Sequence, residues 1–223
     1  GFLIGAENTV EAVLGSGDDA PYYSTLSDFF FQVVFVATAM SIVSGAIAER
    51  MKLWSFLGFA VVMTAVIYPV QGYWKWGGGF LDLMGFSDFA GSGVVHLTGA
   101  CAVLAGVLLL GPRLGKYGRN GEIRALPGAN LPLATLGTFI LWMGWFGFNG
   151  GSELKITDVG EANAVAMVFV NTNKAAAGGA VMAAIVSRLM FRKADLTLVL
   201  NGAITAEPLT PSPLAATLIG AVG

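Results

Sequence analysis

The stretch Val94–Leu110 reads VVHLTGACAVLAGVLLL and contains no Asp, Glu, Lys or Arg. At a helical rise of about 1.5 Å per residue, it would extend about 25 Å, close to the roughly 30 Å of hydrocarbon in a bilayer. One imidazole, that of His96, lies inside this apolar run. The stretch therefore predicts a membrane-spanning helix with an ionisable side chain, and such side chains indicate functional sites by default.

Comparable apolar runs occur along the whole chain. Charged residues make up only 12% of the 223 positions, and hydrophobic residues make up 55%. A soluble domain carries roughly 25% charged residues, and soluble packing would here leave large apolar patches exposed. The alternating segments of about ten residues that a β-barrel needs are not found. We therefore predict an all-α polytopic membrane protein, with spans at Phe29–Ala48, Leu53–Tyr73, Val94–Leu110, Leu131–Phe148 and Ala162–Leu189 and two weaker ones at Leu196–Ala206 and Pro213–Val222.

Basic residues lie mainly in alternate loops between the expected spans. The other loops and the N-terminal segment are mainly acidic, with Lys75 and Lys155 as their bases. The positive-inside rule places the basic loops in the cytoplasm, so the first expected span begins outside the cell. Nine of the twelve Lys and Arg residues follow the first, third and fifth spans: Arg50, Lys52, Arg113, Lys116, Arg119, Arg124, Arg188, Arg192 and Lys193.

Both ends of the chain are apolar. It starts on Gly1–Gly5 (GFLIG) without an initiator Met and stops within an apolar run at Gly223. We therefore expect an internal fragment of a longer protein, in which residues 1–223 form a single, incomplete transmembrane domain. The helix expected near residues 194–206 would reach only about 20 Å, which leaves truncation, tilt and deletion open. The small residues of Ala175–Ala180 (AAAGGA) predict the close approach of another backbone.

Two ionisable residues lie at membrane depth, His96 and Lys174. We interpret His96 as a proton-handling or pore-lining imidazole. A metal site is not expected, because the sequence has one His and one Cys, and no cofactor is expected either. An enzyme with His96 as its acid–base group is disfavoured, because no second ionisable group lies at comparable depth on a neighbouring span. Lys174 is left out of the candidate site, since snorkelling or pairing with a distant carboxylate explains it equally well.

Aromatic residues gather near the outer ends of the spans, among them Phe35, Trp76 and Phe148. An interfacial aromatic belt accounts for most of them. Aromatic faces also attract cations, by about 0.5–2 kcal/mol, and a nearby hydroxyl such as that of Ser152 would complete a site for a small hydrogen-bonding cation. Residue chemistry alone leaves the belt and the cation site both open.

Five motifs resemble those of the ammonium transporter family, the Amt/Mep group, which is more distantly related to the Rhesus proteins. The motifs arrive in family order and cover nearly the whole chain. They are SGAIAERMK (Ser44–Lys52), WGGGFL (Trp76–Leu81), DFAGSGVVH (Asp88–His96), GWFGFNGGS (Gly144–Ser152) and FVNTN (Phe169–Asn173).

The resemblance implies an ammonium-transporter-like helix bundle of eleven transmembrane helices, of which this chain covers about seven. It also implies a multi-pass protein of the plasma or inner membrane, assembled as a homotrimer with one pore per subunit, that serves nitrogen uptake and is not an enzyme. Ammonium or ammonia and the lipid bilayer are the implied partners, together with a cytoplasmic PII-type regulatory protein; nucleic acid is not. A sensor built on the same fold is the alternative function.

The resemblance also assigns roles to single residues. Phe35, Trp76 and Ser152 match the family's outer ammonium site, and Phe35 and Phe148 match its two stacked gate phenylalanines. Asp88 matches an aspartate that stabilises this site without touching the ion. His96 matches the first of two pore histidines, and its partner belongs to a later helix. Ammonium is thus expected to be recruited outside, deprotonated, and passed as ammonia through a hydrophobic pore.

Overall fold

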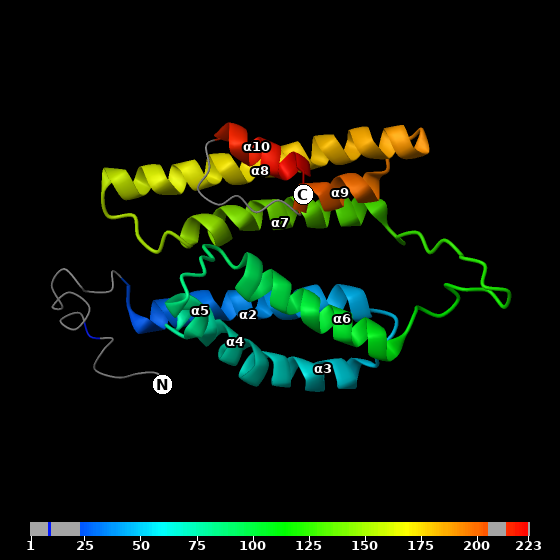
Figure 1. The fold of residues 1–223 in the computed structure, drawn as a ribbon, viewed down its shortest axis with the longest axis horizontal. Helices are drawn as coiled ribbons and strands as arrows, with labels where there is room; N and C mark the ends of the chain where they lie inside the picture. The colour runs from blue at the N-terminus through cyan, green and yellow to red at the C-terminus, as the bar shows by residue number, and fades with distance from the viewer. Residues whose placement is uncertain (1–8, 10–22, 205–212, 223) are drawn as a thin grey trace. The chain divides into compact units, whose positions relative to one another are not determined.

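A computed structural model describes residue 9, residues 23–204 and residues 213–222, and most of the described residues are helical (Figure 1). Two segments, η3 and η4, are π-helical. Their backbone hydrogen bonds join residues five apart in the sequence, whereas those of an α-helix join residues four apart. In chain order the segments are α2 (Thr25–Ile47), α3 (Leu53–Val62), η3 (Met63–Ile67), α4 (Tyr68–Trp76), α5 (Phe80–Leu83), η4 (Ser92–Leu97), α6 (Thr98–Leu110), α7 (Leu131–Gly151), α8 (Val159–Phe191), α9 (Leu196–Ile204) and α10 (Pro213–Val222).

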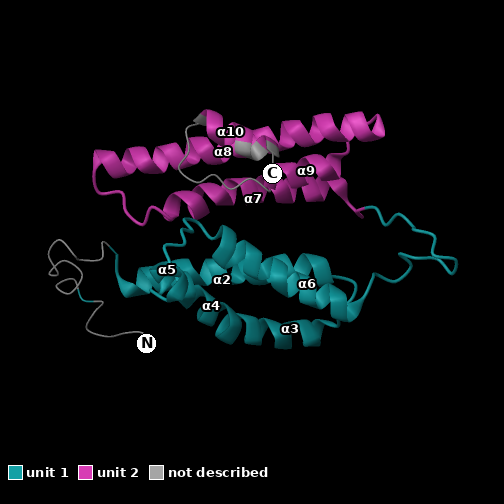
Figure 2. Ribbon diagram, in the orientation of Figure 1, with its two compact units in different colours: residues 1–127 teal, residues 128–223 magenta. Residues whose placement is uncertain are grey.

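The chain divides into two compact units, residues 1–127 and residues 128–223 (Figure 2). In the first unit α2 packs against α6, and α3, η3 and α4 follow one another in a single helical path. Gly99 makes the α2–α6 contact close, since a Cβ there would lie 2.9 Å from the carbonyl oxygen of Ala39. Small residues allow such an approach of two backbones.

In the second unit α8 is the central element. It packs against α10, α9 and α7. Gly178 faces the backbone of Thr217 on α10, and a Cβ at Gly202 of α9 would lie 2.6 Å from the carbonyl oxygen of Gly179. The close backbone approach predicted for Ala175–Ala180 is therefore confirmed on two sides of α8.

Five helical segments are long and apolar enough to cross a membrane, and all five expected spans are confirmed. The first starts earlier than expected, because the Ser24 hydroxyl accepts a hydrogen bond from the Ser27 amide (3.2 Å). The fifth starts earlier because Asp158 Oδ1 accepts one from the Glu161 amide (2.8 Å). The spans are Thr25–Ile47, Leu53–Leu83, Ser92–Leu110, Leu131–Gly151 and Val159–Phe191.

The two weaker expected spans are helices, but short ones. α9 has 9 residues and α10 has 10. Nine residues extend only about 13 Å, less than half of the hydrocarbon thickness. That these two helices cross the bilayer stays a prediction, as does the single transmembrane domain over residues 1–223, and residues 205 and 206 lie outside the described part.

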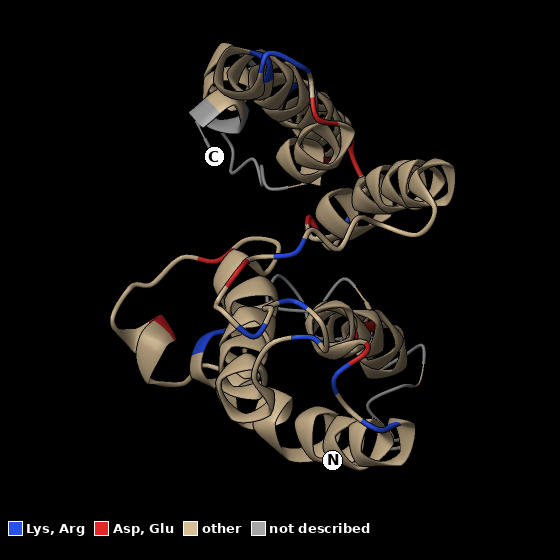
Figure 3. Cartoon of the chain, turned by 90° about the vertical axis from the view of Figure 1, so that its right-hand side faces the viewer, with Lys and Arg blue, Asp and Glu red and all other residues tan. Residues whose placement is uncertain are grey.

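Each of the two units exposes large apolar side chains on its surface. Trp54 is 82% exposed, Leu109 87% and Leu189 78%. Such surfaces are costly in water and favourable in lipid or against further protein. The basic loops after α2 and α6 lie at one end of the first unit, as Figure 3 shows, in agreement with the expected cytoplasmic side.

Candidate functional site

Asp88 is the centre of the best-defined polar structure in the first unit. Its side chain is 7% exposed, and its oxygens accept three backbone hydrogen bonds. Oδ1 accepts from the Gly91 amide (2.8 Å), and Oδ2 accepts from the amides of Gly93 (3.0 Å) and Val94 (2.7 Å). These amides are the unpaired donors at the start of η4, and a carboxylate there is favoured by charge-assisted bonds and by the helix dipole. The carboxylate therefore fixes the start of the helix that carries His96.

Gly91 makes this turn possible. Its φ of +105° lies in the left-handed region, which residues with a Cβ rarely adopt. A Cβ at this position would also lie 3.0 Å from Cβ of Val95 and 3.2 Å from the Trp76 ring. Gly91 is thus required both by the backbone conformation and by the close packing of Trp76 over the turn.

Two side chains of α4 hold the Asp88 segment from the other side. Trp76 Nε1 donates to the backbone carbonyl of Asp88 (3.1 Å), and Gln71 Nε2 donates to the carbonyl of Val94 (2.7 Å). The Trp76 ring meets Phe35 of α2 edge to face, with centroids 5.6 Å apart and planes at 86°. Phe35 is 2% exposed. Phe35, Trp76 and Asp88 therefore form one packed group.

His96 lies on η4, half-buried, eight residues after Asp88. Its Nδ1 is 3.3 Å from the carbonyl oxygen of Gly91. Because a carbonyl only accepts hydrogen bonds, Nδ1 carries the proton in this contact, and in the neutral ring Nε2 is then the acceptor. The π-helical turn places the imidazole directly after the Asp88 turn, and π-bulges are frequent at functional sites.

The second unit carries Phe148 and Ser152 at the end of α7. Ser152 is the C-cap residue of this helix, and its hydroxyl donates to the carbonyl of Phe148 (2.9 Å). Since that bond uses the only hydroxyl proton, the oxygen of Ser152 faces its surroundings as an acceptor. An acceptor suits a cation that donates hydrogen bonds. Both residues are half-buried.

A buried polar pair joins α7 to α8 beside these residues. Asn149 Nδ2 donates to Thr172 Oγ1 (3.1 Å), and the two side chains are 1% and 0% exposed. Phe146 and Phe169 add an edge-to-face contact between the same helices, with centroids 5.4 Å apart. The pair fixes how α7 is rotated against α8, and hence where Phe148 and Ser152 point.

The structure brings together four of the six predicted site residues, namely Phe35, Trp76, Asp88 and His96, within the first unit. Phe148 and Ser152 belong to the second unit. The Phe35–Phe148 gate and the contribution of Ser152 to the outer site therefore stay predictions. The sequence reasoning missed Gln71, Asn149 and Thr172, although the last two lie inside the motifs GWFGFNGGS and FVNTN.

Within the described part of the chain, no group of three or more His, Cys, Asp or Glu residues could hold a metal ion. Lys174 is exposed on α8, and none of the ion pairs among the described residues includes it.

A family model described as the Ammonium Transporter Family matches residues 3–223. This chain belongs to the ammonium transporter family. It is 48% identical over 202 residues to the ammonium transporter Amt2 of Archaeoglobus fulgidus, an alignment that covers 86% of this chain and 42% of that protein. This family member spans about half the length of the curated relatives it matches.

Solved structures of the family share the fold. A structure titled Sensor Amt Protein superposes with a TM-score of 0.82 at 38% identity, covering 88% of this chain and 50% of that chain. The crystal structure of Mep2 from Candida albicans gives a TM-score of 0.77 at 30% identity, covering 89% of this chain and 45% of that chain. Ammonium transporters are integral membrane proteins, and five apolar helices agree with a multi-pass location in the membrane.

Proposed function

We propose that this chain forms the outer recruitment site and the upper pore of an ammonium transporter. The observation that carries the proposal is the packed group of Phe35, Trp76 and Asp88, with His96 on the helix that begins at the Asp88 turn. Aromatic rings, a neutral acceptor and an imidazole at successive positions suit an ion that must be attracted, stripped of water and deprotonated. Catalysis of a chemical reaction is not part of this role, and the family is one of transporters.

Recruitment is the task of Phe35, Trp76 and Ser152. The Trp76 and Phe35 rings attract a cation through their negative faces, by about 0.5–2 kcal/mol, more when water is excluded. Ser152 offers an oxygen, because its proton is donated to the Phe148 carbonyl. Asp88 acts at a distance: its carboxylate is occupied by three backbone amides, so it adds negative potential without offering the ion a direct ligand.

Deprotonation follows because an unpaired charge cannot enter an apolar pore cheaply, a cost of several kcal/mol even after relaxation. Ammonium loses a proton and continues as neutral ammonia past the Phe35–Phe148 gate. The His96 Nε2 lone pair takes up the proton as imidazolium and passes it to the second pore histidine implied by the family. Potassium has no proton to lose and is excluded at this step.

Assembly and regulation follow the family in this proposal. The protein acts as a homotrimer in the cell membrane, and its cytoplasmic face binds a PII-type regulatory protein. A sensor is the second candidate function, because one of the structural matches is titled Sensor Amt Protein. A cytoplasmic signalling domain attached to the full chain would favour the sensor.

The deciding experiment replaces His96 with Leu in the full chain and measures methylammonium uptake and its selectivity against potassium in cells. We expect His96→Leu to lower uptake at least about tenfold or to admit potassium, because a tenfold change corresponds to only about 1.4 kcal/mol in the barrier. Cys101→Ala is the matched control, since Cys101 lies five residues further along the same span and is exposed. Unchanged uptake and selectivity in His96→Leu would contradict the proposal.

A further inference from the structure

A basic pocket of about 530 Å³ lies in the first unit, where α2 and α6 end. Its polar walls come from Arg50, Arg113, Lys116 and Tyr117. The ammonium pathway uses none of these residues. Its apolar wall consists of Val107, Leu108, Pro112 and Leu126.

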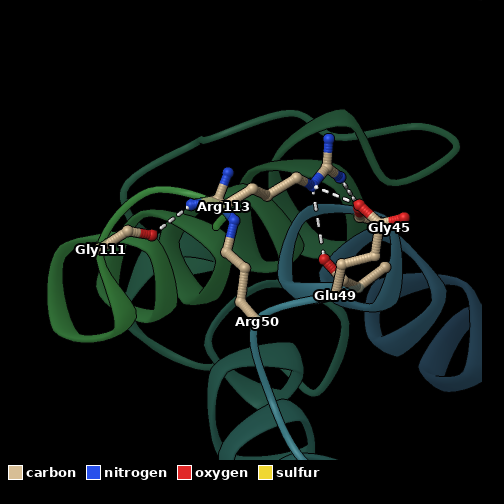
Figure 4. A network of polar contacts seen from close by, with 6 residues as sticks. Gly45, Glu49, Arg50, Gly111 and Arg113 are labelled. Atoms are coloured by element: carbon tan, nitrogen blue, oxygen red, sulfur yellow. Dashed lines mark hydrogen bonds and ion pairs between the residues drawn. The ribbon is translucent and has the colours of Figure 1, made fainter. Parts of the chain in front are cut away.

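Both arginines are held by helix-terminal carbonyls, as Figure 4 shows. Arg50 Nη1 donates to the carbonyl of Gly111 (2.8 Å), which ends α6. Arg113 donates through Nη2 to the carbonyl of Gly45 (3.3 Å), near the end of α2. Cations are favoured at helix C-termini, so each guanidinium is stabilised by the carbonyl group that it contacts. They also fix each guanidinium at the pocket wall.

The donors of Arg50 are not all used. Its Nε atom is buried and has no hydrogen-bond partner among the described residues. An arginine presents five N–H donors in a planar fork, and a buried donor without an acceptor is costly. Arg50 Nε is therefore a buried donor without an acceptor among the described residues.

The charges of the pocket do not balance. Three cations line the pocket, and one ion pair among the described residues involves them: Arg113 Nε lies 3.4 Å from Glu49, whose side chain is 76% exposed. Three positive charges against one negative charge leave a surplus of two. Lys116 is half-buried, and the ion pairs found in the described part of the chain do not include it. The pocket thus has the surplus positive charge that an anion needs.

We propose that this pocket binds the phosphate group of an anionic phospholipid of the cytoplasmic leaflet. The positive-inside rule places the loops after α2 and α6 on that side, and basic pockets beside membrane helices bind anionic head groups there. A guanidinium fork matches phosphate oxygens, and Lys116 adds a point charge.

The apolar wall favours a lipid over free phosphate. Val107 and Leu108 belong to α6, and Leu108 is 75% exposed while the next residue, Leu109, is 87% exposed. An acyl chain could run along this face of α6 while its phosphate lies at the helix end. Inorganic phosphate would gain nothing from these side chains.

The test measures lipid binding to the full chain in detergent by mass spectrometry of the intact protein. Wild type is titrated with phosphatidylglycerol, with phosphatidylcholine of the same acyl chains, and with inorganic phosphate as competitor. Lys116→Gln is the informative variant, because Lys116 lines the pocket without capping a helix. We expect it to bind phosphatidylglycerol about fivefold more weakly, the effect of one basic residue near an anionic surface.

Two controls keep the result specific. Arg124→Gln removes a charge from the same loop, but Arg124 pairs with Glu122 (2.5 Å) and does not line the pocket. It should bind phosphatidylglycerol as wild type does, and Lys116→Arg should restore binding. Equal binding of the two lipids by wild type, or equal losses in Lys116→Gln and Arg124→Gln, would overturn the proposal. Displacement of the lipid by millimolar inorganic phosphate would also overturn it, because it would make this a free-phosphate site.

Discussion

Two charged side chains, Asp88 in the first unit and Lys174 in the second, lie in opposite surroundings. At the turn the backbone is irregular, with a left-handed Gly91 and a π-helical segment, and the Asp88 carboxylate is buried by three amides. α8 runs for 33 residues as a regular helix, and Lys174 near its middle is exposed. Lys174 lies inside an apolar span and Asp88 lies four residues before one, at Ser92–Leu110. Of the two side chains, Asp88 is the one that accepts hydrogen bonds from the backbone of its helix start.

The difference lies in the backbone donors that each location offers. A regular helix satisfies its own amides internally, so it has none to give to a side chain at its middle. An interrupted helix has free amides at each new start, and η4 offers them to Asp88. A carboxylate that is needed inside a membrane protein is therefore expected at such interruptions. The ammonium group of Lys174 is itself a donor and needs acceptors instead, and a regular helix leaves carbonyl groups unpaired only at its C-terminal end.

Removing the Asp88 carboxylate should have the largest effect. In Asp88→Ala the amides of Gly91, Gly93 and Val94 lose their acceptor, at about 1–3 kcal/mol for each unpaired group. We expect a loss of about 3 kcal/mol or more in stability, together with loss of uptake, because the helix that carries His96 no longer starts correctly. Thermal unfolding of the full chain in detergent, followed by tryptophan fluorescence, measures the first effect.

Asp82→Asn is the matched control for this prediction. Asp82 is an acidic residue of the same segment of the chain, but it is exposed and pairs with Lys75. Exposed pairs contribute about 0–1 kcal/mol, so the unfolding temperature should hardly change. Equal shifts in the two variants would mean that the amide bonds of Asp88 do not set it apart.

The Asn149–Thr172 pair tests how α8 handles a polar group that is buried. Thr172 lies two residues before Lys174 on the same helix but is 0% exposed. Asn149→Ala and Thr172→Val should each cost about 1–2 kcal/mol in stability, because each leaves a buried partner unsatisfied. The double variant should cost clearly less than the sum, since the two changes remove one shared bond. Additive losses in the double-mutant cycle would show that the two side chains act independently.

Much of the fold could be predicted because membrane spans depend mainly on composition. The run Val94–Leu110 and its four counterparts need no partner to be recognised, since about 20 apolar residues suffice. The local group of Phe35, Trp76, Asp88 and His96 followed from motifs. Asp88 and His96 are close in sequence, so their placement on one turn required only local structure.

Other features depend on packing that no local pattern reveals. The Gln71 bond to Val94 and the Asn149 bond to Thr172 require a particular rotation of one helix against another, and polar residues in apolar spans look alike before that rotation is known. The third span was expected to start at Val94, but in the structure it starts two residues earlier, at Ser92, with a π-helical turn. Inserting one residue into a helical turn leaves the apolar composition unchanged, so the sequence did not predict it.

Replacing Lys174 should change the stability only slightly, and should raise it, whereas replacing Asp88 lowers it. A lysine at the bilayer centre is unfavourable, but snorkelling of its long stem relieves most of that cost. We expect Lys174→Met to leave uptake unchanged and to stabilise the full chain by about 1 kcal/mol or less, measured by thermal unfolding in detergent. A marked destabilisation would instead show that Lys174 pairs with a carboxylate in the full chain, and the contrast with Asp88 would then disappear.

Asp195 is an exposed carboxylate that, like Asp88, accepts hydrogen bonds from backbone amides at the start of a helix. Its effect on stability should be the smallest of those predicted here. Its Oδ1 accepts from the amides of Thr197 (2.8 Å) and Leu198 (3.2 Å) at the start of α9. The Thr197 hydroxyl, followed by the Leu198 amide, lowers the pKa of this carboxyl below its ordinary value. A lowered folded-state pKa means that the contribution to stability is present above the unfolded pKa, about 3.9, and is lost as the pH falls through the folded value.

Amide hydrogen exchange at the start of α9 therefore reports this loss. After correction for the intrinsic pH dependence of exchange, protection of Thr197 and Leu198 should decrease as the pH falls below about 4, while the middle of α8 stays protected. Asp195→Ala should show the lower protection at every pH, because no carboxyl remains to titrate. Protection that is independent of pH in wild type would mean that burial, rather than the hydrogen-bond pattern shared with Asp88, is what makes a carboxylate stabilise a helix start.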